Sequence, residues 1–164
     1  MALRTDAYYR GVAEKALRSA GMEEPPVEVD ALAEHYAIPV RFVEFPAFFS
    51  GATVNEDGLP VILLNAIKDE PVRRKALAHM LAHVLIVLAD PDSGYPRNTA
   101  PEHEDAELVA GEIVMPEFMV RDQAAKWFND YRYLAGLFAV TEKEMMQKML
   151  DLGIIKQRGM LWDY

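Results

Sequence analysis

The stretch His79-Met80-Leu81-Ala82-His83 carries two histidines four positions apart. On an α-helix, residues at this spacing are separated by about 40° around the axis, so both rings can reach one metal ion. The spacing is the first half of a zinc site of the H-E-x-x-H kind, in which a glutamate after the first histidine acts as general base. Here that residue is Met80, which can neither take nor give a proton. The stretch therefore predicts a metal site without its usual base; the alternative is two core histidines, each bonded to a carbonyl.

A third metal ligand is expected on the next helix. Residues 102–105 read Glu-His-Glu-Asp, and consecutive helical residues point in four different directions. His103 shares a helix face with Ala106 and Ala110, whose small side chains suit close packing against a neighbouring helix. We therefore predict that His103 completes the site with His79 and His83.

The acidic residues around His103 have a simpler interpretation. Carboxylates favour the first turn of a helix because the positive end of the helix dipole lies there. We expect Glu102 and Glu104 to be solvated residues of this kind. Glu107 and Glu112 lie further along the same segment, and neither is predicted to replace Met80 as a base.

Composition describes one acidic globular domain. The 164 residues are enough for a single hydrophobic core, and we expect a single domain over residues 1–164. A net charge of −9 argues against direct nucleic-acid binding, because affinity there comes largely from Lys and Arg. The sequence contains no cysteine, so a metal would be held by histidine and carboxylate side chains alone.

The sequence predicts a cytoplasmic protein without a membrane segment. Arg4, Asp6, Arg10 and Glu14 leave no room for the apolar run of a secretory signal. The longest apolar stretch, from Ala76 to Ala89, is too short to span a bilayer, and we predict that it forms a buried core helix.

Apolar spacing and turn signals predict an α+β plan of helices, a small three-stranded sheet and more helices. The predicted helices cover residues 5–20, 29–36, 69–88, 102–114, 117–129, 131–138 and a last segment from Thr141 to Gly153. The predicted strands cover residues 40–45, 51–54 and 59–64, with a hairpin turn at 55–58. The aromatic loop 45–49 is predicted to pack in the core under the hairpin; the alternative is a surface for a substrate or partner. The methionines Met145, Met146 and Met149 are predicted core residues.

In its sequence motifs the chain resembles the ImmA/IrrE-type metallopeptidases, also called the IrrE N-terminal-like domain. The resemblance extends from about Pro25 to Ile155 and rests on the order and spacing of short motifs. In chain order these are Pro25-Pro26-Val27, Leu32-Ala33, Gly51-Ala52, Ile62-Leu63-Leu64-Asn65, residues 73–83, residues 103–116 ending in Met115-Pro116, Leu134-Ala135, Phe138-Ala139-Val140-Thr141 and Leu152-Gly153. The resemblance implies a zincin-like fold with a metal site on a pair of helices.

The chain departs from the family pattern at the site itself. Met80 takes the place of the catalytic glutamate, and Ala82 that of the usual glycine before the second histidine. The family's third ligand, a glutamate, falls on His103. Three histidines suit zinc or a similar divalent ion. A shift of one or two residues in the comparison would instead offer Glu102, Glu104 or Asp105.

The resemblance implies a function in regulation. Active relatives typically cleave repressor or antitoxin-type regulators, often in phage or mobile-element settings. We therefore expect a protein that holds zinc or another divalent metal at His79, His83 and His103 and binds a regulatory protein partner, with little or no peptidase activity. The alternative is an active zinc-dependent hydrolase or peptidase with a rearranged site that cleaves such a regulator. A third possibility is an interaction domain without a metal.

Overall fold

A computed structural model describes residues 4–93 and 99–156, and their contacts divide the chain into two units. Unit 1 comprises Met1–Met22 and Glu28–Ile113, and unit 2 comprises Glu23–Val27 and Val114–Tyr164. The elements of unit 1 are α1 (Asp6–Ser19), α2 (Val29–His35), β1 (Val40–Val43), β2 (Gly51–Glu56), β3 (Leu59–Asn65), α3 (Glu70–Ala89), a short 3-10 helix (Pro91–Ser93) and α4 (Ala100–Val114). Unit 2 contains α5 (Glu117–Lys126), α6 (Tyr131–Phe138) and α7 (Glu142–Asp151). The predicted α+β class is confirmed.

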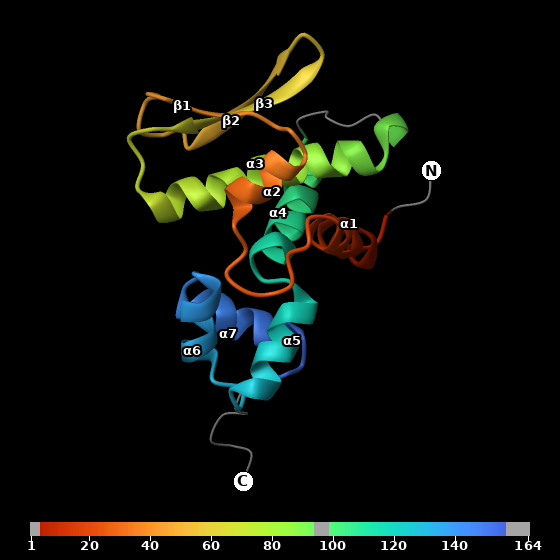
Figure 1. The fold of residues 1–164 in the computed structure, drawn as a ribbon, viewed down its shortest axis with the longest axis vertical. Helices are drawn as coiled ribbons and strands as arrows, with labels where there is room; N and C mark the ends of the chain where they lie inside the picture. The colour runs from red at the N-terminus through yellow and green to blue at the C-terminus, as the bar shows by residue number, and fades with distance from the viewer. Residues whose placement is uncertain (1–3, 94–98, 157–164) are drawn as a thin grey trace. The chain divides into compact units, whose positions relative to one another are not determined.

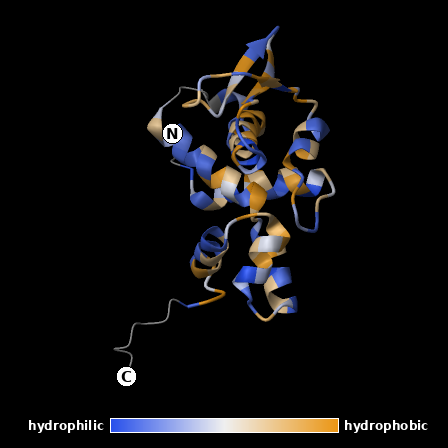
Figure 2. Ribbon diagram, turned by 90° about the vertical axis from the view of Figure 1, so that its left-hand side faces the viewer, coloured by the Kyte–Doolittle hydropathy of each residue, from blue (hydrophilic) through white to orange (hydrophobic). Residues whose placement is uncertain are grey.

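The three strands form one sheet in the order β1-β3-β2. β2 and β3 are antiparallel, whereas β1 runs parallel to β3. Asp57 and Gly58 both have positive φ, and the Asn55 side chain accepts a 2.8 Å hydrogen bond from the Gly58 amide. This is the two-residue turn that Asp-Gly favours, so the predicted hairpin is confirmed. The hairpin tip is hydrophilic (Figure 2).

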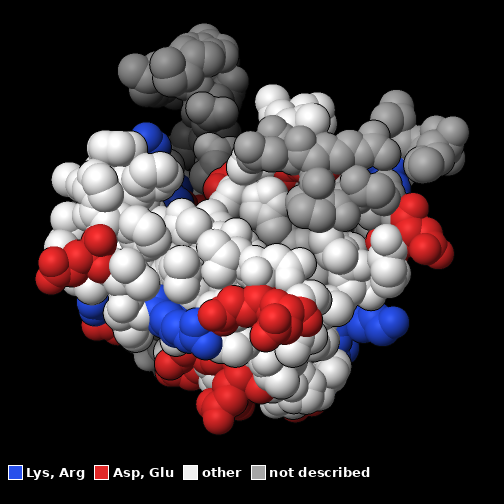
Figure 3. Space-filling view, turned by 90° about the horizontal axis from the view of Figure 1, so that it is seen from above, with Lys and Arg blue, Asp and Glu red and all other residues white. Residues whose placement is uncertain are grey.

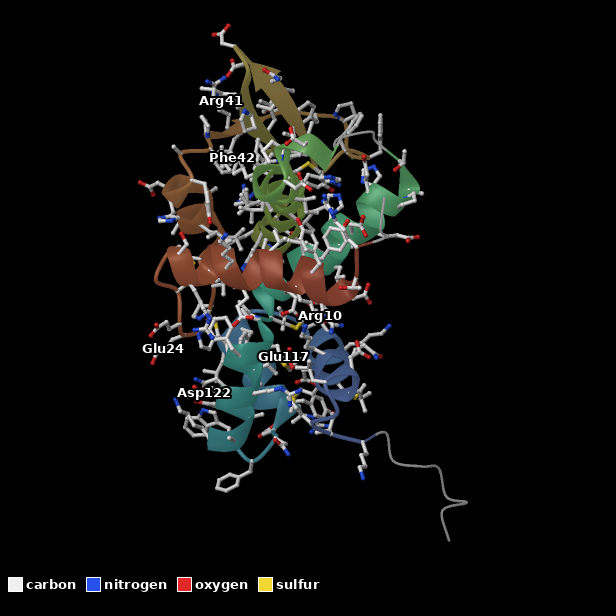
Figure 4. All side chains as sticks on the ribbon, turned by 90° about the vertical axis from the view of Figure 1, so that its right-hand side faces the viewer. Arg10, Glu24, Arg41, Phe42, Glu117 and Asp122 are labelled. Carbon is white, nitrogen blue, oxygen red and sulfur yellow. The ribbon has the colours of Figure 1, made fainter. Side chains whose placement is uncertain are left out.

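The edges of the sheet carry charged and aromatic side chains. Arg41 and Phe42 lie on β1 (Figure 4). Arg41 donates a 2.9 Å hydrogen bond to Glu56 at the end of β2, and the Arg73 guanidinium lies 5.5 Å from the centre of the Phe42 ring. These contacts tie β1 to the hairpin and to α3.

The central element of unit 1 is α3. Asp69 caps its first turn by accepting a hydrogen bond from the Val72 amide, and Pro71 follows at a position where its missing N–H is not needed. The sheet lies on one side of α3, and α1 and α4 lie on the other (Figure 1). Apolar side chains of α3 are buried from Ala76 to Ile86, which confirms the predicted core helix. Among the described residues, no helix combines the length and apolar character needed to cross a membrane.

Unit 2 is held together by apolar residues of its three helices. Leu134 and Phe138 on α6 and Met145 and Met149 on α7 are fully buried. Thr141 and Glu144 form the reciprocal capping box that starts α7, with hydrogen bonds of 3.1 and 3.2 Å. The predictions of core methionines are confirmed for these two residues, and Met146 is half-buried.

Two predictions from the sequence are wrong in detail. The helix expected over residues 117–129 ends at Lys126, because Phe128 and Asn129 adopt left-handed backbone conformations that a helix cannot continue through. The aromatic loop is not core: Phe48 is 81% exposed and Phe49 46% exposed. The loop rings instead contact one another, with 4.8 Å between the centres of Phe48 and Phe49.

The side chain of Asn65 holds the backbone of this aromatic loop in place through hydrogen bonds. Asn65 is fully buried at the end of β3. Its Nδ2 donates to the carbonyl oxygens of Phe45, Pro46 and Phe49, and its Oδ1 accepts from the amides of Phe45 and Ile67. One side chain therefore satisfies several backbone groups that would otherwise be left without partners near the core.

We predict that Asn65→Ala lowers the free energy of unfolding by about 2–4 kcal/mol, because it leaves several part-buried backbone groups unpaired. Urea denaturation followed by circular dichroism measures this change. Asn55→Ala is the matched control: Asn55 is exposed and accepts one hydrogen bond in the hairpin turn, so we expect a loss of about 1 kcal/mol or less. Equal losses in the two variants would contradict the role assigned to Asn65.

Candidate metal centre

Two helices of unit 1 bring three histidines together. His79 and His83 lie one turn apart on α3, and their Nε2 atoms are 3.1 Å from each other. His103 lies near the start of α4, with its ring centre 5.7 Å from that of His79 and 5.1 Å from that of His83. One ring nitrogen of each histidine lies within 4.8 Å of the other two. The structure thus assembles the three histidines singled out in the sequence; their role as ligands stays a prediction.

The geometry of these donors fits a divalent metal ion. Zinc binds histidine nitrogens at about 2.0–2.1 Å, and tetrahedral angles then place two such nitrogens about 3.3 Å apart. The 3.1 Å between the Nε2 atoms of His79 and His83 is close to this value. No two of the three ligand nitrogens are more than 4.8 Å apart. An inward movement of at most about 1.5 Å would bring them to the tetrahedral spacing, and side-chain rotation of the exposed His103 can supply it. Three histidines in this arrangement could bind a metal.

The electrostatics keep His83 neutral, as a metal ligand must be. Burial first, and then the neighbouring His79 and His103, lower the pKa of His83 to about 4, whereas Glu102 acts to raise it. At neutral pH the His83 ring therefore offers a lone pair. The fourth histidine of the chain, His35, lies on α2 and contacts Ser19 at 3.1 Å instead.

Met80 occupies the position beside the first histidine. It is half-buried, and its sulfur accepts a 3.4 Å hydrogen bond from the Thr53 hydroxyl on β2. The thioether therefore lies between α3 and the edge strand of the sheet. It offers a weak acceptor and no proton.

The acidic residues of α4 differ from one another. Glu102 is only 5% exposed, so the expectation of a solvated residue is wrong for it. Glu102 lies close enough to His83 on α3 to affect the pKa of that ring, and it also pairs reciprocally with Thr99 at the helix start, with backbone-to-side-chain distances of 3.4 and 3.5 Å. Glu104 is exposed, as expected. Asp105 is hydrogen-bonded to the buried Tyr9, and burial raises the pKa of both groups. Within residues 4–93 and 99–156, none of these carboxylates joins the histidine group.

Glu107 is the carboxylate that the structure places against the site. Its Oε1 lies 2.7 Å from Nδ1 of His79. The direction of approach does not satisfy hydrogen-bond geometry, so His79 Nδ1 is a buried nitrogen without a hydrogen bond despite the short distance. The Glu107 side chain is 63% exposed, so a small rotation would align its carboxylate with this nitrogen. The sequence offered one signal for this contact: Glu107 lies four residues after His103, on the same face of α4.

Glu112 lies away from the histidines. It is 4% exposed and lies nine residues beyond His103, about 13 Å along the helix axis. One of its oxygens is 3.9 Å from Nε of Arg10, which is labelled on α1 in Figure 4. The prediction that Glu112 cannot act at the metal agrees with this position.

Comparison with known proteins supports the fold and the family. A sequence model of the IrrE N-terminal-like domain matches residues 33–150. Among solved structures, the chain is similar to a Mycobacterium tuberculosis transcriptional regulator, with a TM-score of 0.63 and 19% identity over 93% of this chain and 49% of that one. The chain thus spans about half the length of that protein, and at this identity the likeness shows the fold alone. No curated protein matches the chain.

The family match and the position of the histidines agree with each other. The matched residues 33–150 include the sheet, α3 and α4, and with them all three histidines of the site. The match also covers well over half of the 164 residues. The chain therefore belongs to the family of IrrE N-terminal-like domains.

Proposed function

We propose that this protein holds a divalent metal, most simply zinc, at His79, His83 and His103 and acts by binding a regulatory protein, with little or no peptidase activity. The observation that carries the proposal is the meeting of three histidines from α3 and α4 within 4.8 Å, beside a methionine where the family resemblance places a glutamate.

The donor set supports the metal. Three neutral imidazoles are a sound set for zinc and leave a fourth coordination position open. A bound metal would act as a Lewis acid and lower the pKa of a water molecule at that position. The chain's own contribution is to hold the rings: His79 and His83 through the rigid, buried helix α3, and His103 through α4.

The residue beside the first histidine supports weak or absent peptidase activity. A positioned general base contributes about 10²–10⁴-fold to the rate of such reactions. Met80 cannot serve, and its sulfur is engaged by Thr53. Glu102 is engaged with Thr99 at the start of α4, where it serves as part of the helix cap.

The alternative proposal is an active zinc-dependent hydrolase or peptidase that cleaves a repressor or antitoxin-type regulator. The specific observation in its favour is the same three-histidine set, because a metal with three histidine ligands and an open position can activate water with little help from a base. The absence of a glutamate at position 80 is then no obstacle. The two proposals agree on the metal and differ on cleavage.

Charge supports a protein partner over nucleic acid. The chain carries a net charge of −9, and the described residues visible in Figure 3 show small acidic and basic groups, some of them touching, on a largely uncharged face without a continuous basic surface. A phosphate backbone would be repelled by such a protein. The structural neighbour is described as a transcriptional regulator, which makes a repressor or antitoxin-type regulator the first class of partner to test.

We predict that the untagged protein binds one equivalent of zinc and that His79→Ala and His83→Ala each remove it, because each variant keeps only two of the three histidine ligands, one on α3 and one on α4. Inductively coupled plasma mass spectrometry after dialysis, with isothermal titration calorimetry, measures this. His35→Ala removes a histidine that contacts Ser19 and should leave binding unchanged. Zinc retained at full stoichiometry in both site variants would overturn the proposed centre.

We predict that Met80→Glu gains zinc-dependent peptidase activity of at least tenfold over the wild type, since it supplies the missing base in a site that already holds the metal. Cleavage of a library of fluorescence-quenched peptides measures the gain. Met80→Gln has nearly the same shape without a base and should stay at the wild-type level. Efficient cleavage by the wild type that disappears in His83→Ala would favour the alternative, an active enzyme with a rearranged site.

A further inference from the structure

We propose that Glu107 is a positioning residue for the metal centre: its carboxylate accepts a hydrogen bond from Nδ1 of His79 and so directs Nε2 of that ring to the metal. This inference rests on the proposed function for its consequence, which is tighter metal binding. The contact itself is a property of the chain and can be tested without a metal.

The arrangement of the two rings on α3 fixes which nitrogen faces which partner. The Nε2 atoms of His79 and His83 face each other at 3.1 Å, so the position of a shared metal ion lies on that side of the rings. Nδ1 of His79 lies on the other side of its ring, 2.7 Å from Oε1 of Glu107. The two nitrogens of His79 therefore have separate tasks.

The chemistry of a neutral imidazole makes this division effective. Such a ring carries one N–H and one lone pair, and which nitrogen holds the proton depends on the partners. An ionised carboxylate accepts hydrogen bonds only, so it draws the proton to Nδ1 and leaves the lone pair on Nε2. Metal-bound histidines commonly use a carboxylate in this way, and loss of the partner typically lowers metal affinity by about 10–100-fold.

The distance and the exposure of Glu107 both favour a bond at this position. A separation of 2.7 Å lies in the range of charge-assisted N–H···O bonds. The side chain of His79 is only 16% exposed, and its buried Nδ1 has no hydrogen bond in the observed geometry, so an aligned acceptor there would satisfy it. Glu107 is 63% exposed, so its carboxylate can turn into line with the Nδ1–H without disturbing packed residues.

Helix α4 thus contributes to the centre twice. His103 offers a ligand, and Glu107, one turn later on the same face, supports a ligand that belongs to the other helix. The pairing of the two helices is then reinforced by a contact that also selects the tautomer. A residue that only filled space would not select between the ring nitrogens.

The test compares metal affinity and ring tautomer in Glu107→Ala, Glu107→Gln and the matched control Glu104→Ala. Glu104 is an exposed carboxylate on the same helix, so its removal makes the same change in charge. Zinc affinity is measured by competition with a chelator, and the tautomer of His79 by long-range 1H–15N NMR of the metal-free and zinc-loaded proteins. Urea denaturation of the metal-free proteins checks that each variant folds.

We expect Glu107→Ala to lower zinc affinity by about tenfold or more and to reduce the Nδ1–H tautomer of metal-free His79. Glu104→Ala should change neither. Glu107→Gln keeps an acceptor oxygen without the charge, so it should retain part of the wild-type zinc affinity and of the Nδ1–H tautomer of His79, which a pure charge effect would not produce.

Two failures are distinguishable. If the wild type binds zinc and Glu107→Ala binds it as tightly as Glu104→Ala, with an unchanged tautomer, the role of Glu107 is overturned and the metal centre stands. If the wild type binds no zinc, the proposed function is overturned. In that case the tautomer of His79 in the metal-free protein still tests the contact between Glu107 and His79. A changed tautomer in Glu107→Ala upholds the contact, and an unchanged tautomer refutes it.

Discussion

Burial of α3 on several sides is the constraint on which the rest of unit 1 depends. The sheet covers one side of this helix, and α1 and α2 also pack against it. Because its apolar residues are buried from Ala76 to Ile86, the helix cannot rotate or slide without exposing apolar surface. The directions of His79, His83 and Met80 are thereby fixed. The two histidines face α4, and the methionine faces Thr53 on the sheet.

Polar groups in such a helix are expensive unless they are satisfied, and the site is built around that requirement. Burial and neighbouring rings keep His83 in its neutral form, and His79 meets a carboxylate from a second helix. The Glu107 carboxylate would thus serve two purposes: it would satisfy a buried nitrogen of His79, and it would support the metal binding proposed for that ring. A divalent metal shared by the rings, as proposed above, would satisfy the nitrogens of His79 and His83 that face one another.

Much of this was predictable from local patterns. The helix starts near Asp69 and Thr141, the hairpin turn at residues 55–58 and the histidine spacing each depend on residues close in sequence, and each appears in the structure as expected. His103 was predicted from the small residues that share its face, and Ala106 and Ala110 are indeed buried. The failures have a different character. The burial of Glu102 and the exposure of Phe48 depend on which other segments lie against them, which periodicity cannot reveal.

The sequence by itself determined the helices, the hairpin, the family and the identity of the three histidines, because these follow from propensities, turn chemistry and spacing within short segments. Only the tertiary structure decided how α4 lies against α3, and with it the approach of His103 to the other rings and of Glu107 to His79. A contact between residues nearly thirty positions apart is set by packing across a whole unit, in which each element limits the others. The local sequence around His79 or Glu107 does not indicate how close the two side chains come to each other.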